Sequence, residues 1–266
     1  MAYQISGSEE LIDETDKYVF TIFEPKEQVA EEVSLDRHQT YFVHSGKLEI
    51  EFISGDSKEK LALEEGSGIT ITAGTNYKRQ IKEGSIIFFI AGIETSPGTS
   101  IKIILEDEQG NKTEKNISKY DLTQPKNIKK PWGSESWIIW SKEFYVMKII
   151  KMNEGNKSSL QLHRNKLETN YLLEGKANVV DGFKVDLNLS EEEMQSSING
   201  VDFNQYKELK TQGMHWTSKP GTVHRVIAET NYLAYEVSTP ELDDVTRLED
   251  DSQRNSGRIE EEHREK

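Results

Sequence analysis

With 266 residues, the chain is long enough to fold as two domains, each with its own core. Its formal charge of −14 argues against a nucleic-acid partner, and the absence of cysteine excludes disulfides and thiolate metal sites. The N-terminus lacks signal-peptide features, and the apolar run 86–93 is too short to span a bilayer. We therefore expect a cytoplasmic protein that does not bind membranes.

The first half of the chain is a series of short β-rich runs separated by Gly, Asn and Asp turns. These runs are 18–23, 41–52, 69–73, 86–91 and 101–106. Regularly spaced strands are typical of a sandwich or barrel. The following segment, 106–129, is charged, rich in amides and contains Pro125, which favours a linker or an exposed crossover and predicts a domain boundary near residue 125.

The second half continues with strands and one insertion. We predict strands at 136–140, 145–151, 158–163, 169–173 and 232–237. An insertion at about 190–212 opens with Ser190-Glu-Glu-Glu193, a capping box that predicts a short helix. After residue 251 apolar residues almost disappear, so the chain is divided into domains 1–125 and 126–251 and a mobile charged tail, 252–266.

A glycine-bounded stretch of the second half carries the residues of a metal site. Alternate residues of a strand share a face, so Gln161 and His163 point the same way, as do Lys166 and Glu168. His224 follows a Pro-Gly turn at the start of another strand. We expect Gln161, His163, Glu168 and His224 to bind one divalent transition metal. This nitrogen and oxygen donor set suits Zn, Mn, Fe, Co or Ni and does not choose among them.

The same residues resemble a known family. Gly-x5-Gln-x-His-x4-Glu-x6-Gly, followed by Gly-x2-His-Arg, resembles the two motifs of the cupins, with Gln161 where many cupins place their first histidine. Lys130-Pro-Trp-Gly133, Glu236-Val-Ser and Asp243-Asp-Val-Thr-Arg resemble segments of type II phosphomannose isomerase, the C-terminal cupin domain of mannose-1-phosphate guanylyltransferase. The resemblance covers residues 128–258, roughly half of the chain.

Three features depart from this family. Lys166 replaces its usual arginine, Ser252-Gln253 replaces Tyr-Gly, and the insertion separates the two motifs. No glycine-rich nucleotidyltransferase signature precedes the motifs, so pyrophosphorylase activity is not expected.

The resemblance implies an all-β fold of two tandem cupin barrels, also called double-stranded β-helices or jelly rolls, with the short helical insertion in the second. It also implies a metal-dependent aldose–ketose isomerase, similar to mannose-6-phosphate isomerase, that acts on a sugar or sugar phosphate by enediol proton transfer. Lys166 is the candidate base or proton shuttle, because it shares a face with Glu168 and a nearby divalent cation can lower a lysine pKa. Its alternative is a lysine at the barrel rim. Arg225 is the candidate that holds the enediolate or a phosphate. Members of the family often pair through their sheets, which implies a homodimer.

The first half repeats the second with its ligands replaced. The four ligand positions of the second half align with Glu32, Ser34, Gln39 and Tyr77. This set contains no imidazole, so the first domain is predicted to be a degenerate cupin without metal. His38 and His44 are better explained as barrel or surface histidines than as a site.

Two other functions remain open alongside the isomerase. One is a non-catalytic, metal-containing sugar-binding or regulatory cupin. The other is a metal-dependent dioxygenase, against which Gln161 counts because oxygenases of this fold usually keep a histidine there. Other residues allow two interpretations. His215 either has a structural role or lines the pocket. The tryptophans either form the core and a lid or stack against a sugar (Trp132, Trp137 and Trp140), and a polar segment either is a solvated loop or contacts phosphate (Lys157, Ser158 and Ser159).

Overall fold

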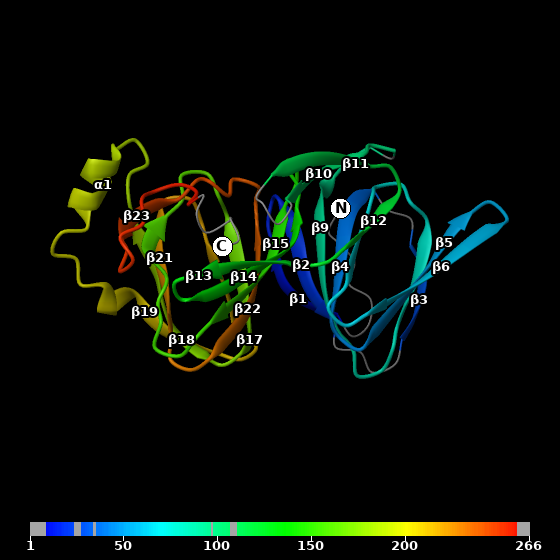
Figure 1. Ribbon diagram of the computed structural model, residues 1–266, viewed down its shortest axis with the longest axis horizontal. Helices are drawn as coiled ribbons and strands as arrows, with labels where there is room; N and C mark the ends of the chain where they lie inside the picture. The colour runs from blue at the N-terminus through cyan, green and yellow to red at the C-terminus, as the bar shows by residue number, and fades with distance from the viewer. Residues whose placement is uncertain (1–8, 24–27, 34–35, 97, 107–110, 260–266) are drawn as a thin grey trace. The chain divides into compact units, whose positions relative to one another are not determined.

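The computed structural model describes residues 9–23, 28–33, 36–96, 98–106 and 111–259. In these residues the fold is built of antiparallel strands with one α-helix, α1 (Glu191–Ser197), and one 3-10 turn, Phe203–Tyr206 (Figure 1). This confirms the predicted all-β class with a short helix in the insertion. No helix in this described part of the chain is long and apolar enough to cross a membrane.

The chain divides into two compact units. The first comprises residues 1–105, 112–125 and 138–145, and the second comprises 106–111, 126–137 and 146–266. The division differs from the predicted boundary near residue 125 in two segments, since 106–111 belongs to the second unit and 138–145 to the first. Of the two alternatives for 106–129, the linker is wrong, because the segment contains the strands β11 (Lys112–Ile117) and β12 (Tyr120–Thr123) and most of β13 (Lys126–Lys130).

The first unit packs a six-stranded sheet against a four-stranded one. The larger sheet has the order β1 (Glu9–Glu14), β2 (Tyr18–Phe23), β9 (Ile86–Glu94), β4 (Arg37–Ser45), β7 (Gly68–Ile71), β12. The smaller has the order β3 (Gln28–Val33), β8 (Tyr77–Ile81), β5 (Lys47–Ser54), β6 (Ser57–Glu64), and β10 (Ile101–Glu106) pairs with β11. Alternate residues of β5, Leu48, Ile50 and Phe52, are buried, so one face of this strand meets the core.

One run predicted as a single strand, 41–52, is two strands. The chain reverses at Gly46, whose φ of +83° suits glycine, between β4 and β5. A Cβ at this position would collide with the Ser85 side chain. The polar residues Ser45-Gly46-Lys47 at this turn were a signal for the reversal that the single predicted strand overlooked.

The interior of the first unit is filled by its own polar side chains at the positions that align with metal ligands. The Tyr77 hydroxyl hydrogen-bonds to Gln39 Oε1 and lies 2.8 Å from the Tyr41 hydroxyl. Arg79 Nη1 donates to the Tyr41 hydroxyl at 3.3 Å. Ser34 and the side chain of Glu32 lie outside the described residues. Gln39 and Tyr77 therefore hydrogen-bond within the protein and are not part of a group of metal-binding side chains.

The two histidines of the first unit lie apart from this network. His38 is buried, its Nδ1 accepts the Ala73 N–H at 3.0 Å, and its ring centroid lies 4.5 Å from that of Phe144. His44 packs edge-on against Phe88. Both contacts fit the structural interpretation of these residues.

The second unit also packs two sheets against each other. One has the order β13, β14 (Gly133–Trp140), β15 (Val146–Met152), β22 (Tyr232–Ser238), β17 (Glu168–Glu174), β20 (His215–Ser218). The other has the order β19 (Lys207–Thr211), β18 (Lys176–Lys184), β21 (Thr222–Ala228), β16 (Leu160–Leu162), β23 (Thr246–Glu249). Ile150, Leu172, Val179 and Ala234 fill the space between the sheets.

The insertion covers the outer face of the second sheet. Leu160 and Leu162 alternate with Gln161 on β16, so they point away from the interior that Gln161 faces. Met194 and Ile198 of the insertion pack against these leucines, and α1 lies beside β23 in Figure 1. The capping box is present: Glu193 N–H donates to Ser190 Oγ, and Ser190 N–H donates to Glu193 Oε2.

Candidate metal centre

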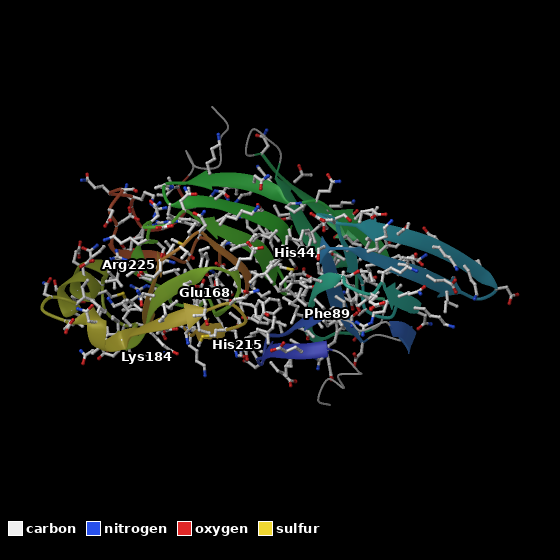
Figure 2. All side chains as sticks on the ribbon, turned by 90° about the horizontal axis from the view of Figure 1, so that it is seen from below. His44, Phe89, Glu168, Lys184, His215 and Arg225 are labelled. Carbon is white, nitrogen blue, oxygen red and sulfur yellow. The ribbon has the colours of Figure 1, made fainter. Side chains whose placement is uncertain are left out.

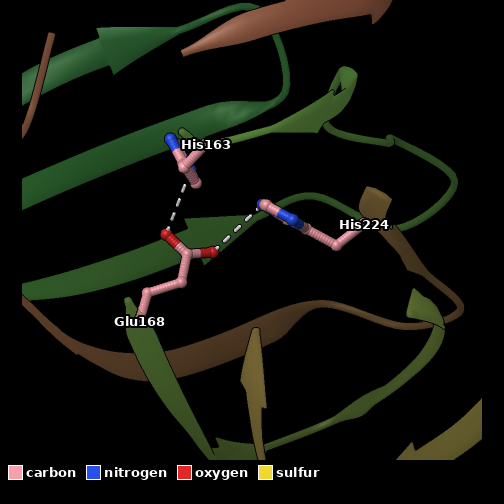
Figure 3. Close-up of side chains that lie close together, drawn as sticks. All are labelled: His163, Glu168 and His224. Atoms are coloured by element: carbon pink, nitrogen blue, oxygen red, sulfur yellow. Dashed lines mark ion pairs between the residues drawn. The ribbon is translucent and has the colours of Figure 1, made fainter. Parts of the chain in front are cut away.

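Three of the four predicted ligands converge in the second unit. His163 follows β16, Glu168 begins β17 and His224 lies on β21. Each offers one ligand atom, and these atoms lie within 4.8 Å of one another (Figure 3). His224 Nε2 lies 3.2 Å from Glu168 Oε1, and His163 Nε2 lies 3.5 Å from Glu168 Oε2. All three side chains are buried, so the charge they carry lies within a low-dielectric interior.

The backbone fixes the orientation of both imidazoles. His224 Nδ1 donates to the Thr222 carbonyl at 3.0 Å, and His163 Nδ1 donates to the Asp244 carbonyl. This tautomer leaves the Nε2 lone pair of each ring turned toward Glu168. His163 Nε2 is buried without a hydrogen-bond partner among the described residues. Two imidazole lone pairs and a carboxylate facing one another fit a divalent transition metal.

Gln161 lies at the edge of this cluster. It pairs with His224 across β16 and β21, and its Nε2 lies 3.4 Å from His224 Nε2. Its Oε1 accepts a hydrogen bond from Ser159 Oγ at 2.6 Å. Rotating the amide by a half turn about its last bond would present the oxygen to the cluster and let the amide donate to Ser159.

Asp244 organises the loop that carries His163. Its carboxylate accepts hydrogen bonds from three successive backbone N–H groups, those of Arg164, Asn165 and Lys166, at 2.5 to 3.1 Å. Its carbonyl also receives the His163 imidazole. The sequence singles out Asp243-Asp as a motif but assigns it no role; only the folded chain brings it to the ligand loop.

Buried charges continue from the cluster along the pocket wall. Lys166 Nζ contacts Glu168 Oε2 and lies 3.0 Å from Glu236 Oε1, which lies 3.3 Å from Lys148 Nζ. Lys148 in turn lies 3.8 Å from Glu135. Strand register creates this row, because Lys148 and Glu236 are direct partners across β15 and β22. Glu135, Lys148 and this role of Glu236 were not predicted, although alternation along each strand indicates which side chains face the interior.

The pKa values follow from these contacts. Burial alone would raise the pKa of Glu168, but the charges of Lys166 and His224 hold it well below its usual range. Burial alone would lower the pKa of Lys166, but Glu168 and Glu236 raise it. The predicted lowering of the Lys166 pKa therefore does not come from the protein's own groups. Lys166 is 4% exposed, so the alternative of a rim lysine is wrong.

Arg225 forms hydrogen bonds and an ion pair within the second unit. Its Nε donates to the Ser158 carbonyl at 3.0 Å, and its Nη2 donates to the Glu249 carbonyl at 3.2 Å. Its Nη1 lies 3.4 Å from the exposed Glu249 carboxylate. Lys157 forms an ion pair with Asp251 at 3.0 Å. These residues support the segment around β16, next to the cluster.

The cluster faces a pocket with an aromatic and polar lining. Trp132, Trp137 and Trp216 contribute to the lining, together with Asn170 and Tyr232. Trp140 belongs instead to the first unit, where Lys112 Nζ lies 4.3 Å from the centre of its ring. His215 is exposed and does not line this pocket; Figure 2 shows it at the margin of the second unit, away from Glu168.

The C-terminal residues lie against the same pocket. Arg247 Nη1 donates to the Gly257 carbonyl at 2.8 Å, and Arg254 Nη2 lies 2.6 Å from Asp250. Residues Arg254, Gly257 and Ile259 are part of the lining. The sequence predicts a mobile tail from residue 252, whereas the chain up to residue 259 makes these contacts. Residues 260–266 lie outside the described part.

Comparisons with known proteins support the fold. No protein-family model and no curated protein matches the sequence. Among solved structures, an oxalate decarboxylase from Lactobacillus farciminis in a formate complex matches with a TM-score of 0.56 and 11% identity over 92% of this chain and 90% of its own. The oxalate decarboxylase from Bacillus subtilis, described with Mn(II) centres, matches with a TM-score of 0.55 and 10% identity over 86% and 71%. A vicilin from tomato, Solanum lycopersicum, matches with a TM-score of 0.54 and 12% identity over 85% and 75%. At these identities the likeness shows the fold: two tandem cupin-like domains, as the sequence predicted.

Proposed function

We propose that the protein is a metal-dependent aldose–ketose isomerase that acts on a sugar phosphate, as its resemblance to type II phosphomannose isomerase implies. The observation that carries the proposal is the position of Lys166, a proton-carrying group between the candidate ligand Glu168 and the pocket carboxylate Glu236. Isomerisation requires such groups, because the C2–H bond breaks, a C1–H bond forms and a proton moves from O2 to O1.

His163, Glu168 and His224 would hold the metal, with Gln161 as the fourth ligand. A bound divalent cation supplies Lewis-acid polarisation of the sugar oxygens. The protein's own groups would move the protons: the Lys166 ammonium can donate one, and the Glu236 carboxylate beside it can accept one. Their contact at 3.0 Å allows the pair to exchange a proton between turnovers.

The charge of the pocket favours an anionic substrate. Its wall carries equal numbers of lysines and glutamates: Lys130, Lys148 and Lys166 against Glu135, Glu168 and Glu236. A bound divalent cation would make this balance positive, which suits a phosphate and a developing enediolate. Arg225 would also bind the phosphate if the substrate displaced the exposed Glu249 carboxylate from Arg225 Nη1.

The test is solvent exchange followed by NMR. Metal-loaded protein is incubated in D2O with aldoses and their 6-phosphates, beginning with mannose 6-phosphate, and the C2 proton and any ketose product are followed. We expect metal-dependent loss of the C2 signal with formation of ketose. Oxalate belongs in the panel because two of the similar structures are oxalate decarboxylases.

A lysine variant separates catalysis from binding. Lys166→Met should keep the metal and lower exchange by about 100-fold or more, because it removes the acid–base group. Lys151→Met is the matched control, since Lys151 is exposed on the opposite face of β15. Sugar binding without exchange in the metal-loaded wild type would instead favour the non-catalytic sugar-binding protein, and metal-dependent oxygen uptake would favour the dioxygenase.

A further inference from the structure

Two buried polar side chains face the pocket without a partner in the described part of the chain. Asn170 is 6% exposed and Tyr232 is 3% exposed, and both line the pocket beside the metal cluster. The Tyr232 hydroxyl has no hydrogen bond among the described residues, and no side-chain hydrogen bond forms to the Asn170 amide there. Buried polar groups are normally paired, so unpaired groups at a cavity wall indicate a ligand.

Strand register directs both side chains to the same cavity. Asn170 lies two residues after Glu168 on β17, and its partners across the sheet are Glu236 and Trp216. Tyr232 lies four residues before Glu236 on β22, on the same face of that strand. Both side chains therefore belong to the surface that carries the cluster and its neighbouring charges.

Two neighbouring polar groups that do not line this pocket are hydrogen-bonded within the protein, whereas a third, the buried Ser238 hydroxyl on β22, has no partner among the described residues. Thr169 Oγ1 lies 2.9 Å from Thr217 Oγ1, and Ser218 Oγ donates to Asp181 at 3.0 Å. Thr169, next to Asn170 on the same strand but on its other face, is one of the paired groups. Unlike Ser238, Asn170 and Tyr232 line the pocket, where a ligand can reach them.

The chemistry of these groups selects the ligand. An amide offers both donors and an acceptor, and a phenol hydroxyl offers one of each, which matches alcohol groups that donate and accept. Burial, together with Glu236 and Glu168, raises the pKa of Tyr232 well above its usual range, so the phenol keeps its proton. The flat faces of Trp132 and Trp216 in the same lining suit the C–H face of a sugar ring.

We propose that Asn170 and Tyr232 form a hydroxyl-recognition subsite that binds the alcohol groups of a sugar next to the metal cluster. The inference rests on the proposed function in taking a sugar as the ligand, and it adds the residues that recognise it. A substrate that lacks these hydroxyls leaves both groups unpaired, and sites built in this way discriminate strongly against such analogues.

The test uses equilibrium binding and does not depend on turnover. Mannose 6-phosphate, fructose 6-phosphate and mannose are titrated into metal-loaded protein by calorimetry. Tyr232→Phe and Asn170→Ala should each weaken binding by about ten-fold, the effect of one lost hydrogen bond. Tyr235→Phe and Asn178→Ala are the matched controls, because these residues lie on β22 and β18 outside the pocket lining, and they should bind as the wild type does.

A second measurement separates recognition from a structural role. Because the Tyr232 hydroxyl has no protein partner, thermal unfolding of ligand-free Tyr232→Phe should occur at the wild-type temperature or above it. A lowered unfolding temperature with unchanged sugar affinity would overturn the inference, as would failure of all three probes to bind. Sugar binding that needs both residues, with no C2 exchange in any aldose, would instead reject the isomerase and leave the subsite established.

Discussion

Asp244 connects the segment before β23 to the loop that carries His163. Its carboxylate holds three backbone N–H groups of the ligand loop and its carbonyl orients His163. An aspartate can do this because two oxygens with several lone pairs accept all three donors at once. The geometry of the candidate metal centre therefore depends on a side chain that does not touch the metal position.

We expect Asp244→Asn to weaken metal binding by about 10-fold to 100-fold, the usual effect of losing a group that orients a ligand. The amide has one accepting atom and turns an NH2 group toward the loop N–H donors. Calorimetric titration of the metal-free protein with Zn2+ or Mn2+ measures the change. Glu241→Gln, at an exposed position nearby, is the control. Equal affinities for the two variants would exclude the positioning role.

His38 makes the stability of the first unit depend on pH. Burial lowers its pKa to about 4, against about 6.5 in the unfolded chain. The unfolded chain therefore binds the proton first, and stability present above pH 6.5 is lost as pH falls toward 4, by up to about 3 kcal/mol.

His38→Gln should make this acid loss shallower, because the amide does not titrate while its oxygen can still accept the Ala73 N–H. Hydrogen exchange of β4 and β7 amides between pH 7 and pH 4.5 measures the slope. His215→Gln, at an exposed position of the second unit, should leave the slope unchanged. A wild-type slope in His38→Gln would show that other groups cause the loss.

Among the strands, β16 lies between the metal centre and the insertion, and its successive side chains face one or the other in turn. Gln161 faces the pocket, while Leu160 and Leu162 face α1. Arg164, just after the ligand His163, donates to the Leu189 carbonyl at 2.9 Å and so ties the insertion to the ligand loop. The insertion thus buries the outer face of the sheet whose inner face carries ligands.

Met194 is fully buried at the centre of this contact. Met194→Ala should therefore destabilise the folded insertion by about 2–5 kcal/mol. The loss should be local, because the helix packs on the outside of the sheet. Hydrogen exchange should therefore rise most in residues 185–206, and metal affinity should change little. Glu191→Ala, exposed on the same helix, is the control. Uniformly faster exchange through the second unit would contradict this local role.

At the scale of the whole molecule, two similar sheet pairs carry one candidate metal centre. The described residues contain one group of three clustered histidine and carboxylate ligands, in the second unit. In the first unit the equivalent interior is occupied by hydrogen bonds among Gln39, Tyr41 and Tyr77. The strand order around the core is thus similar in the two units, while the polar interior differs.

We expect one metal ion per chain and a selective gain in stability. At a free metal concentration of about 100 Kd, binding adds about 2.7 kcal/mol to the unit that holds the site. Elemental analysis measures the stoichiometry, and calorimetric unfolding before and after chelation measures which transition shifts. Two ions per chain, or a shift of both transitions, would contradict a single site in the second unit.

Features that depend on local spacing could be predicted from the sequence. The all-β class follows from short alternating runs, and the helix follows from the Ser190 and Glu193 capping box. The spacing of His163 and Glu168 predicts one half of the metal site, and the resemblance to the two cupin motifs adds His224. Each of these signals lies within one or two strands, or in a motif whose geometry a strand fixes.

The contacts between residues far apart in the sequence became known only from the folded chain. The clamp of Asp244 on the ligand loop, the charge row from Lys148 through Glu236, and the unpaired Asn170 and Tyr232 all depend on strand pairing across the sheets. The strands within 106–129 were missed for the same reason: their charged residues lack an apolar pattern and are held by partners elsewhere in the chain. Strand order and register are long-range contacts, which local sequence patterns do not encode.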